Sequence, residues 1–450
     1  MSKLIGKKIK ELRKELKLTQ SELAEPEMTK SMLSHIENGT ANPSMKNLQY
    51  LAGKLNKPVA YFLEEEVLFG NEIKKDMNDS LSMDEILKIL DHVEELIKLK
   101  DFKVVKNELN KLLNSHKFNE KGKLYADIIY RLALTHLSLN EFEEGEVFLN
   151  KCIDVYIGNT LYVEATRSQL LFLKKMLYYH NYLGCSEVLE RAWELYGKSS
   201  SKDVFLEIEI LSKEPLITIA QGDFERTVEV CEKAIELSNE NNIYYLTDLI
   251  YRNMAITYLL QGQYKKFLIN IDKAKKYVSF TNNKYILARI YQNYAMYENM
   301  MKNPLKALEA LKVYEENTDE RAFYYYLELA RAQYFLGQYE DAMESLMKIN
   351  HEEKIFYLID CIYILNSLVL KGLILSKFKN YDKAIESINK AIDGIKLYIN
   401  IEYEGCVRYA YKELSLAYDA LSEVYSQCGD YEKAFLNLKQ ANEFKELCSR

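Results

Sequence analysis

The chain has 450 residues, of which 48% are hydrophobic and 28% are charged, with only 16 glycines and 5 prolines. It can bury a large core and is too long for one ordinary domain, and the scarcity of helix breakers favours an all-α protein. No apolar run approaches the roughly 18–20 residues of a membrane span, and the N-terminal MSKLIGKKIK lacks an apolar signal core. We therefore expect a cytoplasmic protein without a membrane partner.

The charge is divided unevenly between the two ends of the chain. The net charge is −7, yet the first 57 residues carry 11 Lys and Arg against 6 Asp and Glu, while the remainder carries 49 against 61. A basic head on an acidic body is consistent with nucleic-acid contact that is confined to the head.

Helical patterns follow one another through the head. A first helix is predicted by apolar residues at helical spacing: Leu4, Ile5, Ile9, Leu12 and Leu16. Thr19 and Glu22 have the spacing of a capping box, which predicts a short helix from Gln20 to about Ala24. Pro26 then makes the turn that separates this helix from the next.

The third helix is the expected recognition helix. It is capped by Thr29, runs from about Lys30 to Asn38 and has Leu33 and Ile36 on its inner face. Two short helices joined by a tight turn form a unit that reads the major groove of DNA. The residues expected at base edges are Lys30, Ser31, Met32, Ser34 and His35. Thr29 is also counted among the DNA-binding residues. The residues expected at phosphates, near adjacent helix starts, are Gln20, Asn42 and Lys46.

The segment LTQSELAE…TKSMLSHIENGTANPSMKNLQYLAGKLNKPVAYF resembles the lambda-repressor-like (Xre) helix-turn-helix family over about sixty residues. The ordered combination of LTQ, IENG and NPS carries this resemblance. PEMT makes the turn one residue shorter than in many members, so the recognition helix starts within one residue of Lys30. The alternative is a helical bundle without a DNA role.

The head is assigned to residues 1–66, with a fourth helix capped by Ser44 and a short fifth helix in VAYFL. Residues 67–82 are acidic and polar and are expected to form a linker. The same segment could instead form a helix that packs the two halves of a dimer together.

A repeated unit begins near residue 100: an aromatic residue, two polar residues, a small residue and an amphipathic helix. Clear copies start at Phe142, Phe224, Tyr264, Tyr339, Tyr381 and Tyr431, and weaker ones near Phe102, Tyr182 and Pro304. They follow at intervals of 35 to 50 residues, and each is preceded by another amphipathic helix. Glycines stand two residues before several of the aromatic residues, where the chain must turn.

A period of 34 residues or more with two helices per unit is typical of a tetratricopeptide-type solenoid. We therefore predict a right-handed solenoid of about nine helix pairs over residues 83–450, serving dimerisation and peptide binding. The first helix of each pair lines the concave surface. The repeat pattern is poor near residues 160–215.

Two neighbouring first helices, at Tyr251–Ala255 and Tyr291–Ala295, place an asparagine at the same register. An asparagine side chain offers a donor and an acceptor to a peptide backbone, and an arginine can hold a carboxylate with two hydrogen bonds. The candidate peptide-binding residues are Arg252, Asn253, Tyr291, Gln292, Asn293, Tyr324 and Arg331. The alternative is that these residues only pack the repeats together.

The order of an Xre-type head and a long tetratricopeptide body resembles the RRNPP family of quorum-sensing regulators. The resemblance implies a homodimer, a pseudo-palindromic double-stranded DNA operator and a short imported signalling peptide in the groove. It also implies that Asn253 and Asn293 hold the peptide backbone.

Enzymatic chemistry finds no support in the sequence. The histidines are isolated, and there is no H-E-x-x-H, C-x-x-C, P-loop or nucleophile-elbow motif. We expect no enzyme, no metal and no cofactor. Two other functions stay open: a tetratricopeptide adaptor or phosphatase-assisting regulator of a response regulator, and a phage lysogeny switch.

Overall fold

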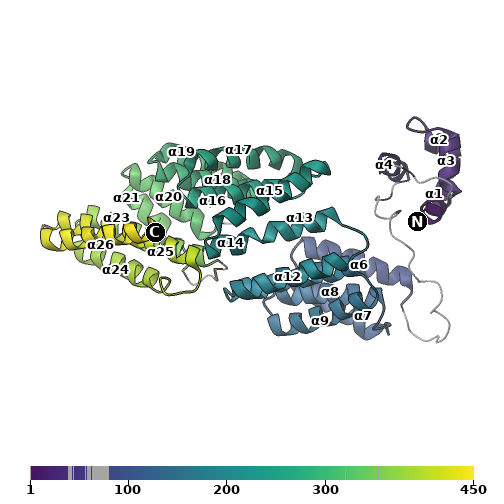
Figure 1. The fold of residues 1–450 in the computed structure, drawn as a ribbon, viewed down its shortest axis with the longest axis horizontal. Coiled ribbons are helices and arrows are strands. Elements are labelled where there is room, and N and C mark those ends of the chain that lie inside the picture. The colour runs from purple at the N-terminus through teal and green to yellow at the C-terminus, as the bar shows by residue number, and fades with distance from the viewer. Residues whose placement is uncertain are drawn as a thin grey trace. The chain divides into compact units, whose positions relative to one another are not determined.

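A computed structural model describes residues 2–38, 43, 45–55, 57, 62, 81–319, 321–351, 354–355 and 357–449. These ranges contain helices and no β-strand, so the predicted all-α class is confirmed. The chain divides into two compact units, residues 1–80 and 81–450, which are drawn together in Figure 1. Gly39, Asn42, Ser44, the fifth helix apart from Phe62, and residues 67–80 of the predicted linker lie outside the described residues.

The head has four described helices: α1 (Ser2–Glu15), α2 (Gln20–Ala24), α3 (Lys30–Glu37) and α4 (Met45–Lys54). The predicted capping box is confirmed, because the Thr19 hydroxyl accepts from the Glu22 N–H at 3.2 Å and the Glu22 carboxylate accepts from the Thr19 N–H at 2.7 Å. Leu16 is 49% exposed because α1 ends one residue before it. Its predicted place on the apolar face of the first helix is therefore wrong.

A single apolar core holds the described head together, with Ile9, Leu23, Leu33, Ile36 and Leu51 fully buried. The backbones of α1 and α3 meet closely at Gly6. An ideal Cβ at that position would lie only 2.0 Å from the carbonyl oxygen of Ile36. Glycine therefore permits this contact, and the contact sets how α3 lies against α1.

The body contains nine helix pairs within residues 81–449, and three of the first helices are each broken in two. In chain order the helices are α6 (Met83–Lys98), α7 (Phe102–Ser115), α8 (Lys123–Ser138), α9 (Phe142–Gly158), α10 (Tyr162–Leu170), α11 (Phe172–Tyr178), α12 (Tyr182–Lys198), α13 (Val204–Lys213), α14 (Pro215–Gln221), α15 (Phe224–Glu240), α16 (Thr247–Leu260), α17 (Tyr264–Thr281), α18 (Lys284–Met300), α19 (Pro304–Asn317), α20 (Phe323–Phe335), α21 (Tyr339–Met347), α22 (Leu358–Ile364), α23 (Asn366–Lys377), α24 (Tyr381–Lys396), α25 (Glu404–Gln427) and α26 (Tyr431–Ser449).

Each second helix begins at the aromatic or proline residue from which a repeat was predicted to start. Two residues earlier, each of these turns has a residue with a positive φ. Four are the predicted glycines and five are not glycine: Lys100, Asn140, His180, Lys302 and Lys379. A left-handed residue ends the first helix and lets the next begin almost at once. The backbone conformation therefore repeats more faithfully than the residue type does.

The broken first helices explain why the repeat pattern is poor near residues 160–215. The first helix of the third pair is interrupted at Leu171 and that of the fourth pair at Glu214, where Pro215 starts α14. A third break, at Leu365, separates α22 from α23. Each break shifts the helical register, so a single repeat template does not extend through these segments.

The body closes on itself between its fourth and ninth pairs. α14 and α25 lie side by side (Figure 1), and an ideal Cβ at Gly405 would lie 2.5 Å from the Gly222 nitrogen. One apolar core contains residues from both 126–220 and 323–424. In a simple solenoid each repeat contacts only its neighbours. This contact between distant pairs was not predicted from the sequence. We call it the ring closure, because it joins the helix pairs of the body into a ring.

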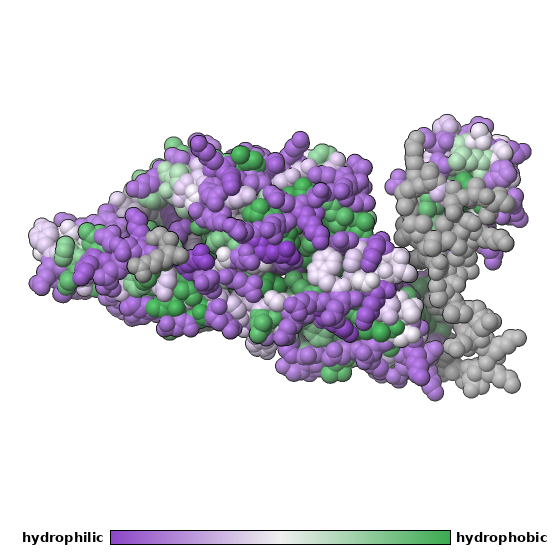
Figure 2. All heavy atoms as spheres, viewed as in Figure 1, coloured by the Kyte–Doolittle hydropathy of each residue, from purple (hydrophilic) through white to green (hydrophobic). Residues whose placement is uncertain are grey.

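One helical stretch, Leu358–Lys377, is long and apolar enough to cross a membrane by composition, and 56% of it is buried. It consists of α22 and α23, and Ile362, Val369 and Ile374 pack in the core of the body. The outer face of the body seen in Figure 2 is mainly hydrophilic, with scattered hydrophobic patches. The apolar composition of this stretch therefore matches its place as a buried first helix.

Candidate functional site

The outer side of α3 presents a polar surface. Thr29 caps the helix by accepting from the Met32 N–H at 3.2 Å, and the buried Leu33 and Ile36 determine which side faces the core. Among the predicted base-contacting residues on α3, Ser34 is half-buried. The other four are exposed: Lys30, Ser31, Met32 and His35. This face has the donors, acceptors and methyl groups that base edges require.

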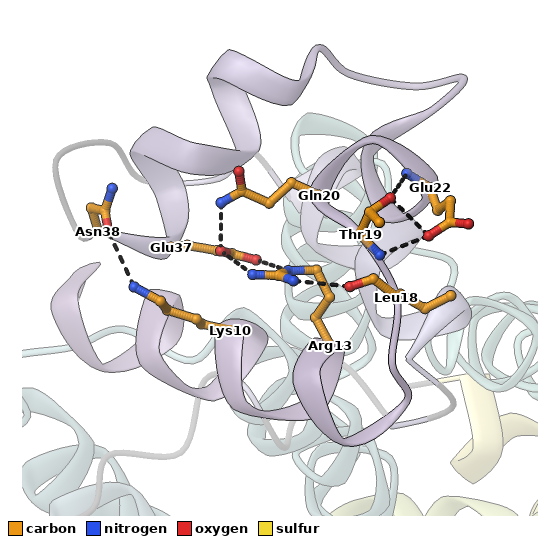
Figure 3. A network of polar contacts seen from close by, with 8 residues as sticks. All are labelled: Lys10, Arg13, Leu18, Thr19, Gln20, Glu22, Glu37 and Asn38. Atoms are coloured by element: carbon orange, nitrogen blue, oxygen red, sulfur yellow. Dashed lines mark hydrogen bonds and ion pairs between the residues drawn. The ribbon is translucent and has the colours of Figure 1, made fainter.

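A closed polar network holds α3 against α1 and α2 (Figure 3). The Arg13 guanidinium donates to both oxygens of Glu37, at 2.5 and 2.9 Å, and the Gln20 amide donates to the same carboxylate at 2.8 Å. Glu37 is 4% exposed. Burial raises the pKa of Glu37, but the hydrogen bonds from Arg13 and Gln20 outweigh this effect and lower it overall. The carboxylate therefore stays charged and orients the recognition helix.

This network changes what is expected of Gln20. One of its two amide N–H groups is engaged by Glu37, so the other amide N–H and the backbone N–H groups at the start of α2 are left to meet a phosphate. Asn42 lies outside the described residues, and Lys46 lies on α4 with an undescribed side chain. Their phosphate contacts stay predictions.

A second polar cluster lies on successive first helices of the body, which we call the arginine-pair cluster: Arg252 of α16, Arg289 of α18, Tyr324 of α20 and Asp360 of α22. Each of these side chains is half-buried. Arg252 Nε donates to Asn293 Oδ1 at 3.0 Å, and the Arg289 guanidinium lies 4.9 Å from the centre of the Tyr324 ring. Tyr324 is hydrogen-bonded to Asp360.

The two arginines lack a carboxylate within ion-pair distance among the described residues. Burial, and then the charge of Arg289, lower the pKa of Arg252 to about 10. Burial raises the pKa of Asp360, and Tyr324 and the two arginines offset this only in part. The cluster therefore has two guanidinium groups and one incompletely stabilised carboxylate, an arrangement that favours an additional anion.

Arg331 belongs to a different and self-contained cluster. Its guanidinium donates to Glu328 at 3.0 Å and to the Tyr363 hydroxyl at 2.9 Å. Glu328 is only 1% exposed, accepts from Asn299 at 2.9 Å and is also hydrogen-bonded to Tyr363. The Arg331 guanidinium is thus already paired with a buried carboxylate of the chain, and its contact with a ligand carboxylate stays a prediction.

Of the other predicted groove residues, Tyr324 belongs to the arginine-pair cluster, and Asn293 contacts the cluster through Arg252. Three of the predicted residues are buried between helices: Asn253, Gln292 and Asn293 are 6%, 2% and 3% exposed. Tyr291 lies beside Tyr294, with Lys275 of α17 5.0 Å from its ring centre. The peptide contacts of Asn253, Tyr291, Gln292 and Asn293 stay predictions.

Arg289 and Asp360 were not among the predicted groove residues. Arg289 precedes Asn293 by four residues, one helical turn, so helical spacing could have placed it on the same face. Asp360 has no such signal, because it stands on the short broken helix α22. Among the described residues no group of three His, Cys, Asp or Glu side chains is arranged to hold a metal ion.

Comparison with known sequences identifies both parts of the chain. The helix-turn-helix family matches residues 9–62, and the tetratricopeptide repeat family matches residues 126–156 and 365–393. The immunity repressor protein of Bacillus phage phi105 is 38% identical over 93 residues, which cover 19% of this chain and 65% of the repressor. The predicted combination of a helix-turn-helix head and a tetratricopeptide body is thereby confirmed.

Two solved structures are similar to this chain. The apo form of RapI superimposes with a TM-score of 0.52 at 12% sequence identity, covering 80% of this chain and 97% of that protein. Bacillus thuringiensis PlcR in complex with the peptide PapR7 and DNA superimposes with a TM-score of 0.38 at 19% identity, covering 62% of this chain and 96% of that one. The likeness to RapI shows the shared helical fold.

Proposed function

We propose that this chain is a cytoplasmic transcriptional regulator of quorum-sensing type, which binds DNA through α3 and a short carboxylate-bearing peptide through its body. The observation that carries the proposal is the pair of half-buried arginines without a carboxylate partner among the described residues, in a chain that also has a helix-turn-helix head. This observation is the reason why the proposal includes a peptide ligand in addition to DNA.

DNA recognition is proposed to use the exposed face of α3 in the major groove. Lys30, Ser31, Met32 and His35 reach outward, Ser34 lies half-buried beside them, and Thr29 lies at the helix N-terminus. Asn42, Lys46 and the start of α2 would meet the backbone phosphates. A homodimer would place two such helices on the half-sites of a pseudo-palindromic operator.

The proposed homodimer has a possible contact surface on α26. Tyr431, Phe435 and Leu436 are 72%, 67% and 54% exposed on this outer helix of the ninth pair. Apolar side chains gathered on one helix are typical of a contact surface. Sedimentation of the full chain should give a dimer, and Phe435→Glu should shift it toward the monomer if α26 forms the interface.

The proposed peptide would place a carboxylate between Arg252 and Arg289. Guanidinium groups bind a carboxylate through charge-assisted hydrogen bonds, and partial burial strengthens them. Asn293 is 3% exposed and accepts from Arg252, so its part in the proposed site is to orient that guanidinium. Peptide binding would alter DNA affinity only if it favours one conformation of the chain.

The experiment is DNA titration with the full chain, using double-stranded DNA selected from a random library by the protein itself. The triple variant Lys30→Ala, Ser34→Ala, His35→Ala should lose specific binding, whereas Lys312→Ala on the exposed side of α19 should bind as the unmodified chain does. Affinity should fall steeply as salt rises, because phosphate contacts release counterions. Unchanged binding by the triple variant would remove α3 from the proposal.

A phage lysogeny switch is the second candidate, and the likeness to the phage phi105 immunity repressor favours it. A match between the selected DNA sequence and a phage promoter would support this version. The adaptor or phosphatase-assisting role requires a response regulator as partner. Capture of a purified response regulator, with and without peptide, tests that role separately from DNA binding.

A further inference from the structure

The short helix α22 connects two features of the body. Asp360, on its first turn, belongs to the arginine-pair cluster. Other contacts of α22 connect it to the third pair. The Leu358 N–H donates to the Tyr182 hydroxyl at 3.1 Å. Just before the helix, the Ile355 carbonyl lies 2.8 Å from His180 Nε2, and Cys361 Sγ lies 4.0 Å from the same nitrogen.

These contacts join segments that are far apart in sequence. Tyr182 and His180 belong to the third pair, and α22 belongs to the eighth. The Tyr182 ring also packs against Tyr403, at 4.9 Å between centres, and the Tyr403 hydroxyl lies 3.2 Å from the Tyr182 nitrogen. Movement of α22 would therefore disturb the closure of the ring.

On its other side α22 faces α20. The Tyr363 ring lies 5.7 Å from the Tyr324 ring, and Tyr324 is hydrogen-bonded to Asp360 and stacks with Arg289. The carboxylate of Asp360 thus lies beside the arginine pair without forming an ion pair with either guanidinium. Its charge is the same as that of the ligand group that the pair is proposed to bind.

We propose that Asp360 is an internal competitor for the arginine pair, and that a ligand carboxylate displaces it and loosens the α22 contacts that close the ring. This inference rests on the proposed peptide site and names how that site is regulated. Two carboxylates held near the same two guanidinium groups repel each other, and the contacts expected to loosen are those of Leu358 with Tyr182 and of Ile355 with His180. The ligand therefore acts on the ring through competition of like charges.

The test uses the full chain and a defined probe, pentaalanine labelled with fluorescein at its N-terminus, with either a free carboxylate or an amide at its C-terminus. Asp360→Asn should raise the affinity for the free carboxylate about tenfold, equivalent to about 1.4 kcal/mol, and leave the affinity for the amide unchanged. The matched control is Asp393→Asn, on the exposed side of α24, which should change neither affinity.

The proposed competition is overturned if folded Asp360→Asn binds the free-carboxylate probe no more tightly than the unmodified chain does, or does not bind it at all. The thermal midpoint of the variant shows that it is folded. An equal gain for the amide also overturns the competition, because the effect would then not depend on the ligand's charge. The assay contains no DNA, so it can succeed even where peptide has no effect on DNA binding and the proposed function fails.

The link to the ring has its own readout in Cys361, which is half-buried beside His180. Its alkylation by iodoacetamide, followed by mass spectrometry of the digested chain, should quicken several-fold in Asp360→Asn and when the carboxylate probe binds. Cys231, buried elsewhere in the body, should keep its rate. If the probe binds more tightly but the rate of Cys361 alkylation is unchanged, the link between the arginine-pair cluster and the ring closure is overturned.

Discussion

The head and the body each place a carboxylate of low exposure near arginine, with opposite results for its proton affinity. In the head, Arg13 contacts both oxygens of Glu37 and the pKa of Glu37 is lowered. In the body, no ion pair forms between Asp360 and Arg252 or Arg289, and the pKa of Asp360 is raised by burial. Direct contact, rather than the presence of arginine nearby, decides which effect wins.

The comparison separates a structural role from a binding role. A carboxylate whose hydrogen bonds are all made by its own chain fixes helices in place, as Glu37 fixes α3. The self-contained Glu328–Arg331 cluster has the same character within the body. A carboxylate that leaves guanidinium groups only partly neutralised, as Asp360 does, is what the proposed anion site depends on. This difference can be tested at both places.

The largest effect is expected when the head network is broken. Glu37→Gln should lower the free energy of unfolding of the head by about 3 kcal/mol, because it leaves Arg13 without its buried counter-charge. Asp360→Asn should change the stability of the body by less than about 1 kcal/mol, because no ion pair is lost. Urea unfolding followed by hydrogen exchange in each unit measures both values. Similar losses at the two positions would remove the contrast.

The next largest effect concerns the backbone contact beside that network. Gly6→Ala should destabilise the head by about 2–3 kcal/mol, since the new methyl group would press on the Ile36 carbonyl and displace α3. Specific DNA binding should weaken together with stability. Gly53→Ala is the matched control on α4, where an ideal Cβ meets nothing within 4 Å. An equal loss in both variants would mean that helix placement at Gly6 is not the cause.

Much of this arrangement could be predicted from sequence because local patterns encode it. Thr19, Thr29 and the residues that open the second helices sit at helix starts, where capping and turn chemistry are specific. The left-handed turn residues were foreseen only where they are glycine. Lys379 adopts the same conformation without any such signal, because the surrounding repeat imposes it.

The ring closure and the arginine-pair cluster could not be predicted in full. Gly222 meets Gly405, and Asp360 joins Arg289, only because the helix pairs curve until distant repeats meet. No pattern in either segment records that curvature. Arg331 was predicted to meet a ligand carboxylate, yet Glu328 stands three residues before it on the same helix, a spacing that could have indicated their ion pair.

Acid should affect the two carboxylates in opposite directions. Glu37 has a folded pKa below its usual value of 4.5, so its stabilisation is present above that pH and is lost as the pH falls through the lower folded value. Asp360 has a folded pKa above its usual 3.8, so the cost of its buried charge disappears as the pH falls through that raised value. The stability difference between the unmodified chain and Glu37→Gln should therefore narrow in acid. The free energy of unfolding of the unmodified chain, Glu37→Gln and Asp360→Asn, measured between pH 7 and pH 3, tests the two signs. A pH-independent difference between the unmodified chain and either variant would contradict the assignment.

The smallest expected effect tests whether the stability of the body can change without any change in its binding site. Lys379 has φ 58° and is exposed in the turn between α23 and α24. Lys379→Gly should raise the free energy of unfolding by about 0.5–1 kcal/mol, because glycine adopts a left-handed conformation without steric cost. Gly429→Ala, at φ 87° in the corresponding turn before α26, should lower it by a similar amount. Both variants should bind the carboxylate probe as the unmodified chain does. If probe affinity instead follows stability in this pair, the arginine-pair cluster responds to the rigidity of the whole ring, and the contrast with the head network would no longer rest on charge alone.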